Sequence, residues 1–221
     1  MRIKQPSTPA GRLLRFAFRL LYTRMAWMYD HVAAAVSFGE WKQWGRIVIP
    51  FLPANTRLLE IGHGPGHLHL ALRQQRRAVV GVDLSPQMSA LASSRLAHAG
   101  MASSVAQASV YQLPFPAVAF GAVISTFPTE FIFSPVMLAE AHRVLQPAGV
   151  LLVVPNAPLR TAGVTGLLGW FIRTWYRAGR LENEELPDVH ALLAQNGFRW
   201  KEHRIPTPHA HVIVWVCEKM E

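Results

Sequence analysis

The sequence predicts an α/β protein with a doubly wound, mostly parallel sheet, an antiparallel final strand and an N-terminal helical cap. Two observations predict this class. From about residue 53 onward, short apolar runs alternate with segments of helical character, and this order places helices on both faces of a parallel sheet. The first run also breaks into glycines at Gly62, Gly64 and Gly66, as a strand does when it turns sharply over a bound ligand.

The strands are predicted from apolar runs that end in turn residues. The run at 78–82 is continuously apolar and ends on Asp83, which is typical of a strand buried on both faces. The second helix has Ser85 as its N-cap and Pro86 at its first position. The predicted strands lie at 57–61, 78–83, 104–108, 122–126, 149–155, 198–205 and 212–218, and the predicted helices at 66–75, 86–99, 135–145 and 186–196.

We predict two regions, an N-terminal helical extension at 1–50 and a main domain at 51–221. In the extension, Arg12, Arg15 and Arg19 share one face of a helix beside an apolar stripe. This helix either lies in a membrane interface or packs on the domain with its arginines in solvent. The main domain carries an aromatic-rich insertion at 161–180. We expect the insertion to be a lid over an apolar substrate or a membrane-facing surface, or else to pack on the N-terminal helix and extend the core.

The composition indicates a folded, basic protein in a reducing compartment. The 221 residues are 51% hydrophobic, which suffices for one α/β domain with an extension. The single cysteine, Cys217, excludes a disulfide framework and a cysteine-cluster metal site, and we expect it in the core. The net charge of +9 favours an anionic partner, either nucleic acid or an acidic membrane. Because no apolar run reaches the ~18 residues that span a bilayer, we expect a cytoplasmic protein, with peripheral membrane association as an alternative.

The spacing of the glycine turn separates two kinds of cofactor. In the dinucleotide-binding fingerprint a third glycine lets helix and strand pack closely, and here that position is His67. Glu60, at the end of the first strand, would repel a pyrophosphate but attract the ammonium and sulfonium groups of S-adenosylmethionine. Asp83 ends the second strand roughly 20 residues past the turn, where an acid accepts hydrogen bonds from a ribose diol. The turn therefore favours S-adenosylmethionine over NAD.

Three segments resemble the class I S-adenosylmethionine-dependent methyltransferases of type 11. Residues 60–66 resemble the family's E-x-G-x-G-x-G motif, and 108–115 and 140–149 resemble its third-strand motif and its turn into the fifth strand. The likeness covers most of residues 58–155. It implies a Rossmann-like fold, a methyltransferase activity, and an adenine ring near Ser109 or the backbone of Val110. The family has an acid where this chain has Ser109, which weakens the expected adenine contact, and Gly121 replaces a second acid.

Residues 22–30 and 36–44 are similar to the cap region of the ubiquinone and menaquinone C-methyltransferases. The likeness includes an alanine, a Tyr-Asp pair and a Ser-Phe-Gly turn, although the family's asparagine in this segment and its signature after the fourth strand are absent. The resemblance implies that Tyr22 and Tyr29 help to close the cofactor pocket. The alternative is that both are core aromatic residues on a helix face. Similar Tyr-Asp starts also occur in phospholipid N-methyltransferases.

The predicted cofactor site combines the cap, the glycine turn and the strand ends. It consists of Tyr22, Tyr29, Glu60, Gly62, His63, Gly64, Gly66, Asp83, Leu84, Met88, Ser109, Val110 and Thr126. No metal site is predicted, because the histidines lack metal-ligand spacing. We expect His67 and His69 to face solvent or cap their helix, and His63 to line the pocket through its backbone. No general base stands out among the candidates Asp30, His31 and Glu130.

The predicted function is methyl transfer from S-adenosylmethionine to a small apolar or membrane-associated acceptor, such as a quinol or a phospholipid headgroup. A basic stripe beside aromatic segments suits such an acceptor. A nucleic-acid methyltransferase is disfavoured, because Thr126-Phe127-Pro128 stands where the family's amino-methylating enzymes have an Asn/Asp-Pro-Pro-aromatic motif, and no RNA-reading module is visible. The competing prediction is a protein without enzymatic activity, which binds the cofactor as a sensor or serves as an interaction domain.

Overall fold

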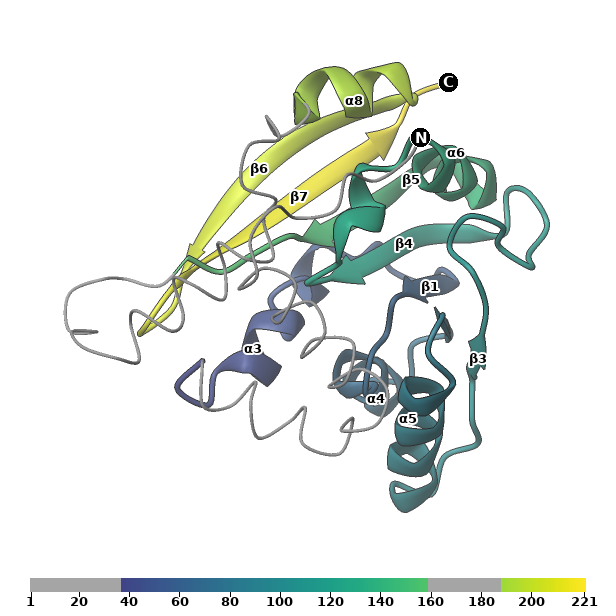
Figure 1. The fold of residues 1–221 in the computed structure, drawn as a ribbon, viewed down its shortest axis with the longest axis vertical. Helices are drawn as coiled ribbons and strands as arrows, with labels where there is room; N and C mark the ends of the chain where they lie inside the picture. Colours follow the sequence, from purple (N-terminus) through teal and green to yellow (C-terminus); the bar gives the residue numbers. More distant parts are fainter. Residues whose placement is uncertain (1–36, 159–187) are drawn as a thin grey trace, which may run out of the picture.

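The computed structural model describes residues 37–158 and 188–221. A seven-stranded mixed sheet runs through this part of the chain in the order β3-β2-β1-β4-β5-β7-β6 (Figure 1). The strands are β1 Leu58–Ile61, β2 Val79–Asp83, β3 Val105–Gln107, β4 Phe120–Thr126, β5 Leu145–Val154, β6 Phe198–Pro206 and β7 His211–Lys219. Strands β1 to β5 pair in parallel, whereas β7 is antiparallel to both β5 and β6. The predicted fold class, with its antiparallel final strand, is confirmed.

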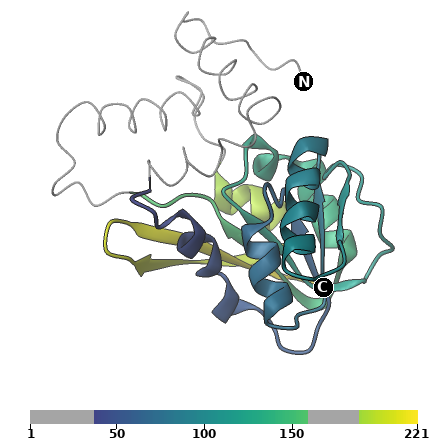
Figure 2. The same ribbon diagram turned by 90° about the horizontal axis from the view of Figure 1, so that it is seen from below.

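Helices cover both faces of the sheet (Figure 2). On one face, Trp44, Leu68 and Leu72 pack with the β1 residue Leu58 into one core cluster. On the other face, residues of α6 and α8 pack with β1, β5 and β7 into a second cluster. The helices are α3 Trp41–Arg46, α4 His67–Gln74, α5 Pro86–His98, α6 Pro135–Val144 and α8 Val189–Gln195, with short 3-10 helices η2 Ile49–Phe51 and η3 Glu130–Phe133.

Most predicted elements are present, and the differences lie at their ends. Strand β5 begins at Leu145, four residues before the predicted start at 149, because Leu145 already pairs with Phe120 of β4. The residues between them were predicted to form a turn, and Ala148 does adopt a left-handed φ of 56°. The α5 start is as predicted: the Ser85 hydroxyl accepts a hydrogen bond from the Met88 N–H, and a proline occupies the first turn.

The described part of the N-terminal extension packs on the sheet. Trp44 and Val48 are 2% and 0% exposed and belong to the same core cluster as Leu58 of β1. The boundary between 50 and 51 stays a prediction. The arginine-rich helix, Tyr22, Tyr29, Asp30, His31 and the aromatic insertion at 161–180 lie outside the described residues.

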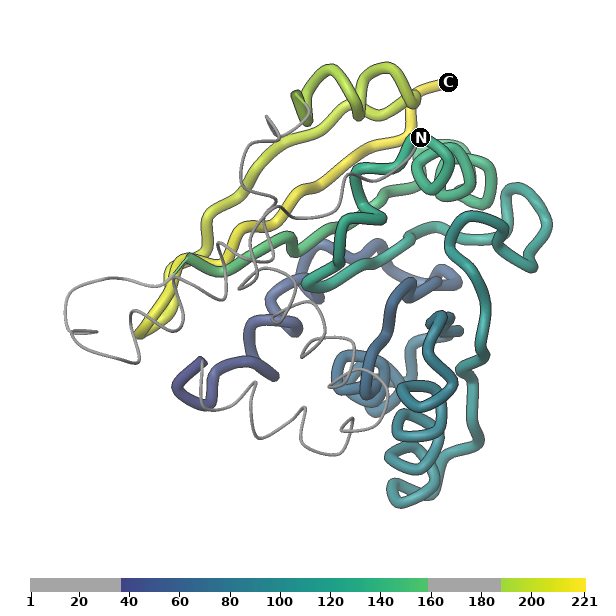
Figure 3. Tube along the Cα trace, viewed as in Figure 1, coloured from purple at the N-terminus to yellow at the C-terminus, as the bar shows by residue number. Residues whose placement is uncertain are grey.

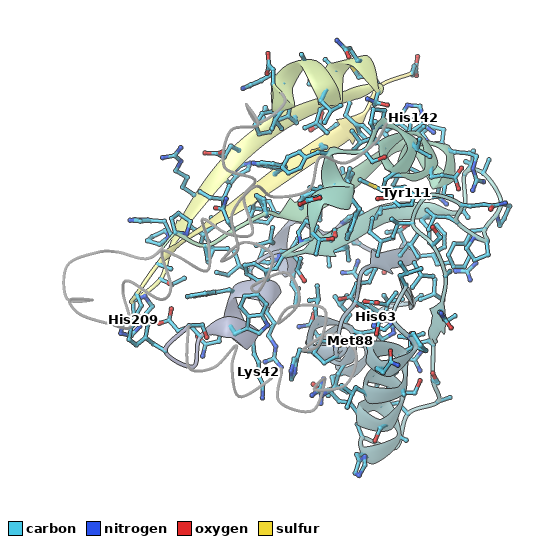
Figure 4. The ribbon with its side chains drawn as sticks, in the orientation of Figure 1. Lys42, His63, Met88, Tyr111, His142 and His209 are labelled. Atoms are coloured by element: carbon cyan, nitrogen blue, oxygen red, sulfur yellow. The ribbon has the colours of Figure 1, made fainter. Side chains whose placement is uncertain are left out.

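Glu40 joins this extension to the turn between β6 and β7. Its Oε2 accepts hydrogen bonds from the Trp44 indole at 2.9 Å and the Thr207 hydroxyl at 2.9 Å, and its Oε1 lies 2.8 Å from Nδ1 of His209. Phe38 stacks on the His209 ring at 5.0 Å. Figure 2 shows α3 beside this hairpin, and Figure 4 shows His209 at its tip. Burial opposes ionisation of Glu40, but the hydrogen bonds from His209, Trp44 and Thr207 outweigh it, so the pKa of Glu40 is lowered.

The C-terminal strand ends against α6 and α8 (Figure 3). The Met220 N–H donates to the Gly197 carbonyl at 2.8 Å, and Lys219 donates to the carbonyls of His142 and Leu145. Cys217 on this strand is 0% exposed, as predicted, and burial raises its pKa to about 12. No helix within 37–158 and 188–221 is long and apolar enough to cross a membrane.

Candidate functional site: the carboxyl edge of strands β1, β2 and β4

The turn from β1 into α4 has left-handed backbone at each predicted glycine. Gly62, Gly64 and Gly66 have φ values of 65°, 53° and 79°. A Cβ on Gly66 would lie 2.7 Å from the Cβ of Ala92 on α5, and a Cβ on Gly62 would lie 3.2 Å from the Phe131 ring. Conformation therefore favours glycine at all three positions, and space requires it at Gly66, whereas a Cβ on Gly62 would need the Phe131 ring to shift by a few tenths of an ångström. The result is a tight backbone cradle at the carboxyl edge of the sheet.

Asp83, the last residue of β2, is held beside this turn by backbone donors. Its Oδ2 accepts a hydrogen bond from Gly64 N–H at 2.9 Å, and its Oδ1 accepts one from Ser85 N–H at 2.8 Å. Each carboxylate oxygen has two lone pairs, so both oxygens keep the capacity to accept a further hydrogen bond from a diol. The arrangement fits the predicted role of Asp83.

The other predicted ligands differ in how accessible they are. Thr126 ends β4 beside β1, and Leu84 is 69% exposed directly after Asp83. Ser109 accepts a hydrogen bond from Tyr111 N–H at 3.2 Å, so its hydroxyl stabilises the loop after β3. Val110 is 8% exposed and Met88 is 0% exposed. The Met88 side chain therefore belongs to the core beneath the turn.

The expectation for His69 is wrong. Its side chain neither faces solvent nor caps α4: it is 0% exposed, and its Nδ1 lies 3.0 Å from Oε2 of Glu60, which is itself 1% exposed. The sequence carried a signal for this burial, because His69 lies three residues before the buried Leu72 on the same helical stripe. His63 is also buried, at 5% exposure, with Nδ1 2.7 Å from the Gly64 carbonyl oxygen (Figure 4).

Comparison with known proteins identifies the family. Residues 59–153 match the model of a methyltransferase domain. Over 207 residues the chain is 32% identical to the ubiquinone/menaquinone biosynthesis C-methyltransferase UbiE of Syntrophotalea carbinolica, a match that covers 84% of this chain and 87% of that protein. The chain belongs to the class I S-adenosylmethionine-dependent methyltransferases. S-Adenosylmethionine is accordingly its methyl donor.

A second relative agrees with this family, and a solved structure shares the fold. The methyltransferase is 32% identical over 143 residues to the demethylmenaquinone methyltransferase of Thermus thermophilus, covering 62% of this chain and 65% of that protein. This match thus spans slightly less than two thirds of the relative. The YcgJ protein of Bacillus subtilis has the same fold, with a TM-score of 0.60 and 18% identity over 81% of this chain and 99% of that one.

Aromatic side chains flank the carboxyl end of β4 in this methyltransferase, which the sequence analysis missed. The Phe127 ring stacks on Trp41 of α3 with centroids 4.0 Å apart. Phe127 itself has a left-handed φ of 50°, and its N–H donates to the Val154 carbonyl at 2.7 Å. On η3, the Phe131 ring lies against Gly62. The available signal was the three phenylalanines, Phe127, Phe131 and Phe133, within the seven residues that follow a buried strand.

The structure also contains a hollow that lies apart from the glycine turn. A hollow of about 390 Å³ is lined by residues 54–57 and 75–78, which precede the first residues of β1 and β2. It therefore lies at the amino end of these strands, away from the glycine turn, and Arg57, Arg76 and Arg77 are among the residues that line it. Within the described ranges, no group of three or more His, Cys, Asp or Glu side chains could hold a metal ion.

Proposed function

We propose that this methyltransferase methylates a ring carbon of a quinol-type acceptor. The support comes from the relatives, whose names describe demethylmenaquinone methylation and C-methylation in ubiquinone and menaquinone biosynthesis. The predicted alternative of a phospholipid headgroup is not represented among these two relatives.

The observation that carries the proposal is the group of aromatic side chains around the carboxyl end of β4, with Trp41 and Phe127 on one face of the sheet and Phe131 on the other. Trp41 and Phe127 stack at 4.0 Å, and Phe131 packs against Gly62 of the donor turn. Flat aromatic side chains bind a flat aromatic ring through offset or edge contacts and large apolar area. A quinol ring presents such a face, whereas an ethanolamine or a choline headgroup would contact aromatic rings through its cation instead.

The chain's own residues have separable tasks in this proposal. Glu60 pairs with the ammonium group of the donor, Asp83 accepts hydrogen bonds from its ribose, and the left-handed turn allows the backbone to approach it. When bound, S-adenosylmethionine supplies a methyl group on a sulfonium centre. The aromatic residues orient the acceptor and exclude water, which is the main requirement of an in-line displacement.

A ring carbon becomes nucleophilic when a neighbouring hydroxyl loses its proton, so a base is required. Of the three predicted candidates, Asp30 and His31 lie outside the described residues. Glu130 begins η3, is exposed, and is followed directly by Phe131. Glu130 therefore remains the candidate base with a defined position.

The test is a transfer assay with methyl-labelled S-adenosylmethionine and four acceptors: a reduced demethylmenaquinol, a reduced ubiquinol precursor, phosphatidylethanolamine vesicles and transfer RNA. We expect label in a quinol product, with the new methyl group on a ring carbon by mass spectrometry and NMR. Phe127→Leu should raise KM for the quinol and leave the affinity for S-adenosylmethionine unchanged. Asp83→Ala should weaken binding of S-adenosylmethionine itself.

Label in the lipid amine or in RNA, with none in either quinol, would overturn the proposal. Donor binding without transfer to any of the four acceptors would favour the non-catalytic module instead. Phe133→Leu is the control for Phe127→Leu, because Phe133 faces Trp215 across a distance of 6.5 Å on the other face of the sheet.

A further inference from the structure

We infer that His69 is a positioning residue for the methyl donor: it fixes the Glu60 carboxylate so that this carboxylate can pair with the donor's ammonium group. The inference rests on the role proposed for Glu60. It assigns a function to a histidine on the buried face of α4, together with Ser104 before β3 and Gly81 within β2.

The three side chains form a continuous hydrogen-bonded chain under the glycine turn. Glu60 Oε2 lies 3.0 Å from His69 Nδ1, and His69 Nε2 lies 2.8 Å from the Ser104 hydroxyl. Glu60 and His69 are 1% and 0% exposed. A histidine with both ring nitrogens engaged and no access to water cannot rotate without breaking a hydrogen bond, so it holds the carboxylate in one orientation.

The partners determine which nitrogen carries the proton. An ionised carboxylate can only accept hydrogen bonds, so Nδ1 of His69 must be the donor to Glu60. In the neutral ring Nε2 is then an acceptor, and the Ser104 hydroxyl donates to it. Glu60 thereby selects the tautomer with the proton on Nδ1, and the Ser104 hydroxyl, which can donate or accept, supplies the matching hydrogen bond to Nε2.

Strand β2 leaves room for this ring at Gly81. A Cβ on Gly81 would lie 3.0 Å from His69 Nδ1 and 3.1 Å from Cδ2 of His63. Gly81 pairs with Glu60 of β1 in the sheet, and its φ does not lie in the left-handed region. Its lack of a side chain is therefore explained by the space that the two imidazole rings and the Val105 side chain, also 3.0 Å away, occupy, and an added methyl group would press against His69 Nδ1.

The physical reason for such a device is the burial of Glu60. A carboxylate without access to water needs a hydrogen-bond donor or a counter-charge, or it takes up a proton and becomes neutral. His69 donates a hydrogen bond to Glu60 while S-adenosylmethionine is not bound. A carboxylate that is already oriented then pairs with an incoming ammonium group without a reorganisation cost.

The test compares two ligands that differ in the amino-acid part. S-Adenosylhomocysteine carries the ammonium group, whereas 5′-methylthioadenosine has the same adenosine and thioether without it. We expect His69→Leu to weaken S-adenosylhomocysteine binding by about 10- to 150-fold, the range of one hydrogen bond to a charged group, and to leave methylthioadenosine binding unchanged in calorimetry. His69→Asn should restore binding, because its amide N–H can replace Nδ1.

Two further variants separate positioning from folding. Gly81→Ala should reproduce the ligand-selective loss without removing any hydrogen-bonding group. Leu72→Ala is the matched control: Leu72 is 0% exposed on the same face of α4, so its truncation loosens helix packing and should change both affinities by the same factor. The ¹⁵N shifts of His69 in the unliganded protein should also report a proton on Nδ1 that is retained in Ser104→Ala, because the Glu60 carboxylate still accepts it.

Equal effects of His69→Leu on both ligands, or no effect on either, would overturn the inference. Losses of S-adenosylhomocysteine affinity that add fully in the double variant of Glu60→Gln and His69→Leu would also overturn it. Two residues that act through one contact should together lose less than the sum of their separate losses. If Glu60→Gln leaves S-adenosylhomocysteine affinity intact, the role of Glu60 fails and the inference fails with it. No acceptor is present in these measurements, so a failure of the quinol proposal is read separately, in the transfer assay.

Discussion

Replacing Gly66 by alanine tests whether the glycine turn depends on backbone conformation alone or also on packing against α5. Gly66 has a φ of +79°, and an added Cβ would lie 2.7 Å from the Cβ of Ala92. Left-handed backbone costs a residue with a Cβ about 1–2 kcal/mol. Forcing a methyl group into filled space costs about 1–3 kcal/mol more. We therefore expect Gly66→Ala to lower the free energy of unfolding by about 2–5 kcal/mol.

Gly100 provides the matched control. It has a φ of +71°, but nothing lies within 4 Å of an added Cβ. Gly100→Ala should cost only the backbone part, about 1–2 kcal/mol, which corresponds to a fall in Tm of about 2–8 °C for a chain of this length. Gly66→Ala should lower Tm by about 4–20 °C.

The assay is urea unfolding followed by circular dichroism, with thermal melting as a second measurement. In an Ala92→Gly background, Gly66→Ala should recover most of the packing part of the loss, because the nearest contact, the Ala92 methyl group, has gone and only the Cα of residue 92 at 3.1 Å remains close. Equal losses for Gly66→Ala and Gly100→Ala in the wild-type background, or no recovery with Ala92→Gly, would refute the packing argument.

Three further predictions concern single side chains. The lowered pKa of Glu40 means that its ionised form stabilises the fold above its ordinary pKa of 4.5, and that this stabilisation is lost as the pH falls through the lower folded value. The difference in unfolding free energy between wild type and Glu40→Gln should thus shrink below that pH, and a constant difference would contradict it. Burial raises the pKa of Cys217 to about 12, so this thiol should not react with a thiol reagent in the native protein. It should react with one equivalent of reagent in denaturant, whereas rapid labelling of the native protein would show that the strand is open. Arg143 donates hydrogen bonds to the carbonyls of Phe115 and Leu113 and to both carboxylate oxygens of Glu140. Arg143→Lys should therefore lower the free energy of unfolding, measured in urea, by about 1–3 kcal/mol. An unchanged unfolding midpoint would mean that solvent replaces these hydrogen bonds.

Local sequence was sufficient for the features that depend on near neighbours. The strands follow from continuous apolar runs, and the left-handed glycines follow from the close spacing of Gly62, Gly64 and Gly66. The Ser85 cap involves an acceptor and a donor three residues apart. Each of these can be read in a short window, because the interacting groups are fixed relative to one another by the chain itself.

The features that were missed depend on packing between distant segments. Glu60 meets His69 only because α4 folds back over β1 and β2, and Ser104 is 35 residues beyond His69. Phe131 lies against Gly62 because β4 is inserted next to β1 in the sheet. Gly121 was noted as a replaced acid, but its reason is steric: a Cβ there would lie 2.0 Å from the Thr56 hydroxyl oxygen. No one of these contacts is encoded by a short pattern.

The Glu40 contact has a consequence for the order in which the chain becomes organised. Its partners Thr207 and His209 lie 167 and 169 residues further along, so during synthesis this junction cannot form until the residues up to His209 have left the ribosome. Contacts of such separation are also entropically costly to close early. The segment at 37–46 should consequently gain protection from proteolysis later than the central strands. In a ribosome-bound chain truncated before residue 207, Thr207 and His209 are missing. The Glu40 carboxylate, which accepts a hydrogen bond from the Trp44 indole, would then not be held in place by the hairpin.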